Sequence, residues 1–218
     1  NLSIGEVEQE GNILYHKSEY RERRDHFAFF SVNADISGFD TDRDAFLGHM
    51  GDWRKPEAVR DNRMKESIAC GWAPMAANSV EITLQPGESR SLVYLLGYAE
   101  NEPDQKWEAP GIINKTAAKE LVARFSSDAD VFQAFGELKT YWDTLLNRFT
   151  LNSGETELDR MVNIWHPYQC MVTFLMSRSA SYFESGTGRG MGFRDSCQDL
   201  LGFVHLIPAQ ARQRILDI

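Results

Sequence analysis

The chain has 218 residues, of which 42% are hydrophobic and 25% charged, a composition typical of a globular protein with one or two domains. Its formal net charge of −9 argues against a general nucleic-acid or anionic-membrane binder, because such proteins present a basic field to phosphate groups. The odd number of cysteines, with no C-x-x-C spacing, and the lack of any signal-like or membrane-length apolar run indicate a cytoplasmic protein.

The first hundred or so residues have the pattern of β-structure. Two short aromatic-rich runs, "GNILYHKSEY" and "HFAFFSVNADISGFD", predict strands, the second ending at Gly38. The segment "SVEITLQPGESRSLVYLLGY" predicts a hairpin, because apolar residues alternate on both sides of a Pro86-Gly87 pair suited to a type II turn. The irregular region from about residue 41 to 78 predicts a long loop that carries function or contacts another domain.

The pattern becomes helical after the punctuated stretch "NEPDQKWEAPG". Apolar residues then recur at spacings of three and four, which predicts one helix from Thr116 and a second that Ser127 and Asp128 cap. A third helix is expected from Glu155, with a kink or break at Pro167. Strands first and helices second argue against an alternating, doubly wound parallel sheet.

The segment "SGTGRGMGFRDSCQDLLG" is unusual, because it combines four glycines at alternate positions with two arginines and two aspartates within eighteen residues. Small residues there would let Arg178, Arg189, Arg194 and Asp195 approach one hydroxyl-rich or anionic ligand closely. The segment fails the dinucleotide-binding pattern G-x-G-x-x-G, so the residue chemistry leaves two interpretations open: a polar-ligand site, or a surface turn whose ions pair with one another. The scattered histidines predict no metal site, and the helical aromatics, Trp142 and Trp165 among them, predict core packing.

The run "RMVNIWHPYQCMVTFLMSRSASYFESGTGRGMGFRDSCQDLLGFVHLIP" resembles the inverting disaccharide phosphorylases of glycoside hydrolase family 94, and most closely those that cleave cellobiose. The similarity extends through "GFDTDRDAFLG", "GWAP", "LQPGESRSLVYLLGYAEN" and "INK". One departure is His166-Pro167, where the family pattern has an amide pair.

The resemblance implies a chain of β-structure followed by α-structure, in three parts. Residues 1–110 would be the C-terminal part of a β-sandwich domain, 111–150 a helical linker, and 151–218 the beginning of an (α/α)6 barrel catalytic domain. The chain would then be a piece of a longer cytoplasmic, homodimeric enzyme.

The resemblance also implies roles for the charged residues. Arg189, Arg194 and Asp195 would bind the non-reducing sugar, and Arg178 would belong to the phosphate subsite. The reaction would be phosphorolysis of cellobiose with inversion, giving α-glucose 1-phosphate and glucose, without metal or organic cofactor. The general acid would lie downstream of Ile218, so no catalytic residue is expected here. The alternatives are a diacetylchitobiose or cellodextrin phosphorylase, or a non-catalytic carbohydrate-binding β-sandwich protein.

Overall fold

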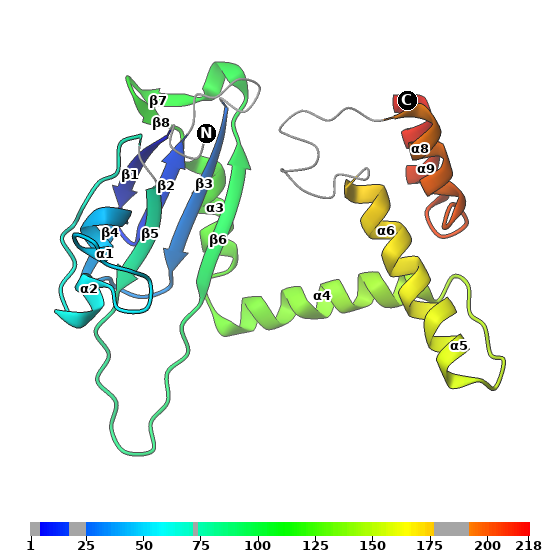
Figure 1. Ribbon diagram of the computed structural model, residues 1–218, viewed down its shortest axis with the longest axis horizontal. Coiled ribbons are helices and arrows are strands. Elements are labelled where there is room, and N and C mark those ends of the chain that lie inside the picture. The colour runs from blue at the N-terminus through cyan, green and yellow to red at the C-terminus, as the bar shows by residue number, and fades with distance from the viewer. Residues whose placement is uncertain (1–4, 18–24, 72–73, 177–191) are drawn as a thin grey trace. The chain divides into compact units, whose positions relative to one another are not determined.

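The computed structural model describes residues 5–17, 25–71, 74–176 and 192–218 (Figure 1). These form two compact units, residues 1–133 and 134–218. The three-part division inferred from the sequence stays a prediction.

The strands are β1 (Glu6–Glu10), β2 (Ile13–Lys17), β3 (His26–Val32), β4 (Gly38–Asp42), β5 (Pro74–Ser79), β6 (Tyr94–Glu100), β7 (Trp107–Ala109) and β8 (Ile112–Ile113). The helices are α1 (Arg43–Leu47), α2 (Glu57–Arg60), η2 (Pro103–Gln105), α3 (Thr116–Arg124), α4 (Asp128–Leu146), α5 (Thr156–Arg160), η3 (Met161–Trp165), α6 (His166–Met176), α8 (Phe193–Leu201) and α9 (Pro208–Asp217).

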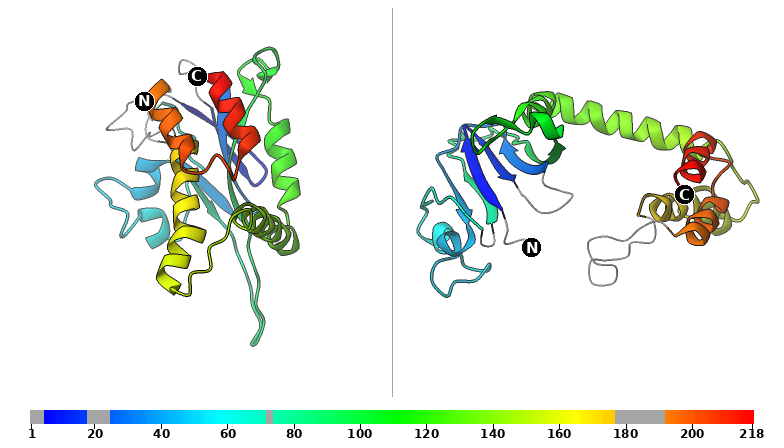
Figure 2. Two further views of the ribbon diagram at one scale, coloured as in Figure 1. Left: turned by 90° about the vertical axis from the view of Figure 1, so that its right-hand side faces the viewer. Right: turned by 90° about the horizontal axis from the view of Figure 1, so that it is seen from above.

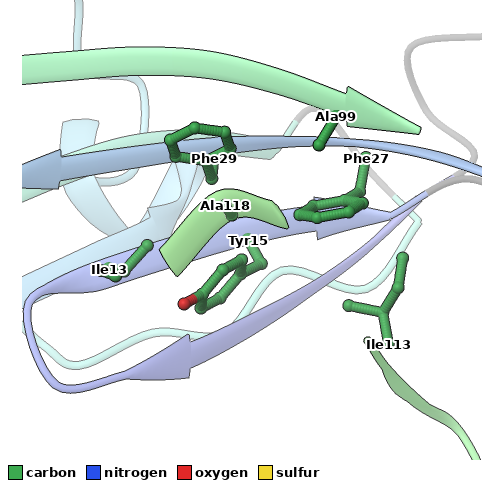
Figure 3. Packing of buried hydrophobic residues seen from close by; sticks show 7 residues of the cluster. All are labelled: Ile13, Tyr15, Phe27, Phe29, Ala99, Ile113 and Ala118. Atoms are coloured by element: carbon green, nitrogen blue, oxygen red, sulfur yellow. The ribbon is translucent and has the colours of Figure 1, made fainter. Parts of the chain in front are cut away.

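An antiparallel four-stranded sheet, ordered β1-β2-β3-β6, organises the first unit. Helix α3 lies along one face, as Figure 2 shows, and Ala118 of that helix packs into the aromatic core of the sheet (Figure 3). On the opposite face, residues 74–76 of β5 line a small cavity together with side chains of β2, β3 and β6. The β-structure is therefore layered, with α3 covering one face of the sheet and β5 part of the other.

The core depends on a close approach between Phe29 and Gly97, which pair across β3 and β6. Phe29 is 1% exposed, and its ring occupies the space that a side chain on residue 97 would need. The tilted rings of Phe27 and Tyr15 continue this aromatic row along the same face. A glycine in the strand interior, normally unfavourable, is required here by the ring that lies over it.

A ladder of opposite charges runs along β1 on the face that α3 covers. Glu6, Glu8 and Glu10 occupy alternate positions and so point to one face. Glu6 and Glu8 pair with Lys17 of β2 at 3.2 and 2.7 Å, Glu8 also pairs with Lys115 at the start of α3, and Glu10 pairs with Lys119 within α3. This Glu-Lys ladder ties α3 to the edge of the sheet.

The predicted hairpin at residues 80–96 is wrong in its pairing. The turn is present, with Glu88 N–H donating to the Gln85 carbonyl and Gly87 at a φ of 85°, as a type II turn requires. Residues 80–93 form no strand, however, and the flanking strands belong to different sheets, because β5 pairs with β4 and β6 pairs with β3. The strand predicted to end at Gly38 likewise ends at Val32, and Gly38 begins β4.

The region from 41 to 78 is more ordered than the sequence predicts, because a buried carboxylate organises it. Asp40 has no exposed surface and accepts hydrogen bonds from the backbone N–H groups of Lys65 and Ser67 and from the Ser67 hydroxyl. The same region contains α1, which Asp42 caps through its side chain, and α2. Both oxygens of the buried carboxylate thus accept a hydrogen bond, and these bonds fix the loop to β4.

The helices match the sequence prediction closely. Ser127 caps α4 through a reciprocal arrangement, accepting from the Asp130 N–H while the Asp130 carboxylate accepts from the Ser127 N–H at 3.0 Å. At Pro167 the helix widens rather than breaks: the His166 N–H donates to the Met161 carbonyl, five residues back, within the π-helical segment η3. This turn stands directly before the residue that lacks an N–H donor.

The second unit has its own core, made by Leu145, Met171, Phe203, Leu206 and Ile207, all nearly inaccessible to solvent. Trp142 packs against this core as expected. The prediction was wrong for Trp165, which is 48% exposed and contacts Tyr168 edge-on at the surface. No helix in the described part of the chain is both long and apolar enough to cross a bilayer.

The close fit at residue 97 predicts that Gly97→Ala lowers the free energy of unfolding by about 1–3 kcal/mol, because the new methyl group displaces the Phe29 ring. Gly136→Ala is the matched control: residue 136 lies inside α4 with open space around it, and alanine there is expected to stabilise by about 0.5–1 kcal/mol. Urea unfolding followed by circular dichroism measures both. Equal effects of the two substitutions would contradict the fit described here.

The Glu-Lys ladder predicts a defined pH dependence of stability. Burial disfavours the charge on Glu8, but hydrogen bonds from Lys115 and Lys17 outweigh it and lower the pKa of this carboxyl below 4.5; for Glu10, the hydrogen bond from Lys119 lowers the pKa. Burial also opposes the charges on Lys17 and Lys115, yet hydrogen bonds to Glu8 raise the pKa of both amines above 10.5. The carboxylates therefore contribute stability above pH 4.5 and the amines below pH 10.5.

Accordingly, the free energy of unfolding of the chain is expected to fall as the pH drops below 4.5, and to fall less steeply in Glu8→Gln. Glu8→Gln is also less stable than the parent at neutral pH, because it leaves buried amines without their counter-charge. Glu81→Gln, at an exposed residue without a described ion pair, serves as the control and keeps the parent profile. Identical acid slopes for Glu8→Gln and the parent would refute the role of the ladder.

Candidate functional site

Helix α8 carries the described part of the predicted sugar site. It begins immediately after Gly192, whose carbonyl accepts the Ser196 N–H at 2.9 Å. Arg194 and Asp195 stand in the first turn, Arg194 exposed and Asp195 half-buried. Arg178 and Arg189, with Gly186, Gly188 and Gly190, lie outside the described residues. The structure thus describes two of the four predicted ligand-binding side chains, adjacent on one helical turn.

The Asp195 carboxylate turns back over the beginning of its own helix. A Cβ atom placed on Gly192 would lie 3.2 Å from Oδ2 of Asp195, so the carboxylate stands over a residue that has no side chain. Glycine also offers no side-chain acceptor for the first-turn N–H groups, which have no partner within a helix. The start of α8 therefore places backbone N–H groups and the Asp195 carboxylate side by side, a combination of donors and acceptors of the kind that a sugar hydroxyl can bond.

The opposite end of α8 anchors it in the second unit. Leu200 is buried, and the turn that follows brings Phe203 against the ring of Phe174, with the ring centroids 5.5 Å apart at 76°. Gly202 approaches α6 closely, since a Cβ atom there would lie 2.6 Å from the Cys170 sulfur. Burial and the nearby Asp199 charge raise the pKa of the Cys170 thiol, so it acts as a neutral packing group. The anchor thus holds α8 by its C-terminal end, while Phe193 and Arg194 at its beginning are exposed.

Sequence reasoning missed three polar features of the described residues. They are the Glu-Lys ladder on β1, the buried Asp40 and the Ser31 hydroxyl at the wall of a cavity. Only the first has a visible signal, because "EVEQE" places a glutamate at every second residue. The described residues contain no cluster of three or more His, Cys, Asp or Glu side chains suited to a metal ion.

Comparison with protein families divides the chain in the same order as the structure. Residues 2–128 match the glycosyl hydrolase 94 supersandwich domain, and residues 141–218 match the catalytic domain of the glycosyl hydrolase 94 superfamily. The first match covers more than half of the chain.

Individual relatives agree with the family matches. The chain is 31% identical to the N,N'-diacetylchitobiose phosphorylase of Vibrio furnissii, over 88% of this chain and 22% of that protein. It is 30% identical to the enzyme of the same name from Vibrio proteolyticus, over 99% of this chain and 25% of that protein. It is also 33% identical to the cyclic beta-(1,2)-glucan synthase NdvB of Rhizobium meliloti, over 87% of this chain and 6% of that protein. The chain thus spans a quarter or less of the length of these relatives.

The contact between α6 and α8 predicts that Gly202→Ala destabilises the second unit by about 1–3 kcal/mol, because the added methyl group overlaps the Cys170 sulfur. Adding Cys170→Ala removes the sulfur, leaving a Cβ separation of 3.6 Å, an ordinary van der Waals contact. The double variant should therefore recover part of the loss. A double-mutant cycle from urea unfolding measures the coupling, and purely additive effects would contradict this contact.

Proposed function

The chain belongs to glycoside hydrolase family 94, and from this membership we propose that it forms part of an inverting phosphorylase that cleaves a β-linked disaccharide with inorganic phosphate. The observation that carries the proposal is the catalytic-domain match over residues 141–218, which includes the Arg194-Asp195 pair at the start of α8. We propose cellobiose as the substrate and α-glucose 1-phosphate and glucose as the products.

Asp195 is proposed to orient the non-reducing glucosyl ring by accepting hydrogen bonds from its hydroxyls. Arg194 and Arg189 are proposed to donate to the same ring, and Arg178 to bind phosphate. Arginine is suited to both tasks, because its guanidinium stays charged and donates through a planar fork. Fixing the ring with its anomeric carbon facing phosphate contributes to rate by orientation, without bond-making by these residues.

The chemical step follows from inversion. A phosphate oxygen attacks the anomeric carbon from the face opposite the glycosidic bond, that bond breaks, and a carboxylic acid protonates the departing oxygen. Phosphate takes the place of the activated water of an inverting hydrolase. Asp195 is not proposed as this acid; we propose that sequence downstream of residue 218 supplies it, in a full-length enzyme that is cytoplasmic and homodimeric.

We also propose that the helices of the second unit begin an (α/α)6 barrel. Their packing supports this, because α6 and the segment from α8 to α9 share one apolar core with the end of α4. The catalytic-domain match over the same residues supports it as well.

A second candidate substrate is N,N'-diacetylchitobiose. The identity to the two Vibrio enzymes favours it. The reverse reaction distinguishes the candidates: a cellobiose enzyme uses α-glucose 1-phosphate as donor, and a diacetylchitobiose enzyme uses the N-acetylglucosamine 1-phosphate. Release of phosphate from each donor, with the matching sugar as acceptor, measures the preference.

In the full-length protein, Asp195→Ala is expected to lower kcat/KM for phosphorolysis by a factor of about 10³ or more, because ring orientation is worth several kcal/mol. Asp217→Ala, at an exposed residue in the last turn of α9, is the matched control and keeps the parent rate. Formation of α-glucose 1-phosphate is measured, with unfolding curves to verify folding. Near-parent phosphorolysis by a folded Asp195→Ala variant would remove Asp195 from the site.

A further inference from the structure

A cavity of about 390 Å³ lies in the first unit, on the face of the four-stranded sheet that α3 covers. Its volume falls within the range of about 300–1,000 Å³ that is usual for small-molecule sites. Its walls combine apolar side chains of the sheet and α3 with polar residues from the β1–β2 turn, from the end of β3 and the loop after it, and from α3 and the residues that follow it. These polar residues are Asn12, Ser31, Asn33, Asp35, Lys119 and Ser126. None of these residues belongs to the α8 segment.

The cavity arises from the order of side chains along β3. Phe27, Phe29 and Ser31 alternate along the strand and so point to the same face, where the two aromatic rings fill the core under α3. Ser31 pairs with Ile13 on one side and Leu95 on the other, and all three line the cavity. The aromatic row therefore ends at a serine, whose small side chain leaves the space open.

Ser31 supplies a hydroxyl to the inner wall of the cavity. The residue is 2% exposed and lines the cavity. Its hydroxyl is not among the described buried polar atoms that lack a hydrogen-bond partner, so it keeps access to the open space of the cavity. There it offers one donor and two acceptor lone pairs to a polar occupant.

The rim of the cavity favours a neutral occupant over an anion. Lys119 is already paired with Glu10 at 2.5 Å, and Asp35 adds an exposed carboxylate without an ion pair among the described residues. The amide of Asn33 is held by Ser126 and Val93, which fixes the rim, and the Asn12 amide donates to the Val32 carbonyl, leaving its own oxygen as an acceptor. The lining offers hydrogen-bond acceptors and the hydroxyls of Ser31 and Ser126, but no uncompensated positive charge.

We propose that this cavity binds a neutral monosaccharide in its pyranose form. Such a ring presents hydroxyls at its edge, for Ser31, the Asn12 oxygen and Asp35, and C–H groups on its faces, for the apolar side chains of Val122 and Phe125. A sugar phosphate is disfavoured by the Asp35 carboxylate. The proposal stands on the first unit alone and does not depend on the function proposed for the α8 segment.

The test is a titration of the ¹⁵N-labelled chain with glucose, followed by amide chemical shifts. Binding in the millimolar range is expected, with the largest shifts at Ser31, Asn33, Val122 and Ser126. Ser31→Leu fills the cavity and should weaken binding at least about tenfold, while Ser91→Leu, an exposed residue outside the cavity, is the matched control and should bind as the parent does. Absence of shifts at the lining residues, or parent-like binding by Ser31→Leu, would overturn the proposal.

Two further variants distinguish glucose binding at the cavity from a loss of folding and from binding at the α8 segment. Asp35→Asn removes a charge at an exposed residue without a described partner, so it keeps the fold. Replacing a charged acceptor with a neutral, weaker one should weaken glucose binding several-fold. Glucose 6-phosphate should bind Asp35→Asn better than it binds the parent, because the repulsion is gone. Asp195→Ala should leave the shifts at the cavity unchanged; a loss of these shifts in a folded Asp195→Ala variant would contradict a separate site.

Discussion

The first unit depends on the opposite charges that run along β1. Glu8 is the central member, because its carboxylate joins β1 to Lys17 of β2, to Lys115 at the start of α3 and to the backbone N–H of Ile113. The two lysine side chains are nearly inaccessible, so neither charge is tolerable without its partner. A ladder of this kind contributes little net stability over apolar packing, but it penalises any arrangement in which the helix slips along the sheet. The position of α3 in turn decides which residues of the sheet form a core and which are left facing open space.

The aromatic core and the cavity are two consequences of that position. Where α3 covers Phe27 and Phe29, the rings are packed, and Gly97 makes room for one of them. Where the helix nears its end, β3 offers Ser31 in place of a third aromatic residue, and the space stays open. One strand thus supplies both the packing that holds the helix and the polar group that a ligand would need. The same alternation of side chains explains both, without any change in backbone geometry.

The sequence predicted the features that depend only on neighbouring residues, such as helix caps and turns. Ser127 reads as a helix cap, Pro86-Gly87 as a type II turn and Pro167 as a disturbance, and each is found where the pattern places it. Strand pairing was predicted less well, because alternation at residues 80–84 shows a half-buried pattern but does not specify a partner strand. The contacts of Glu8 with residues about a hundred positions away, and the buried Asp40, depend on tertiary structure that no spacing reveals. At the candidate site, residue chemistry left open both a polar-ligand site and a surface turn, and only the resemblance to family 94 favoured the first and suggested a ligand.

The described part of the α8 segment also suggests why a glycine, Gly192, and not a capping side chain, stands directly before Phe193 at the beginning of the helix. A serine or aspartate at position 192 would cap the first turn and stabilise the helix by about 1 kcal/mol. It would also occupy the space beside the Asp195 carboxylate, 3.2 Å from Oδ2, and compete for the N–H donors there. The helix is instead secured at its other end, by Leu200 and Phe203 in the core of the second unit. Stability is therefore supplied at the end of the helix that lies away from Arg194 and Asp195, the residues proposed to contact the sugar.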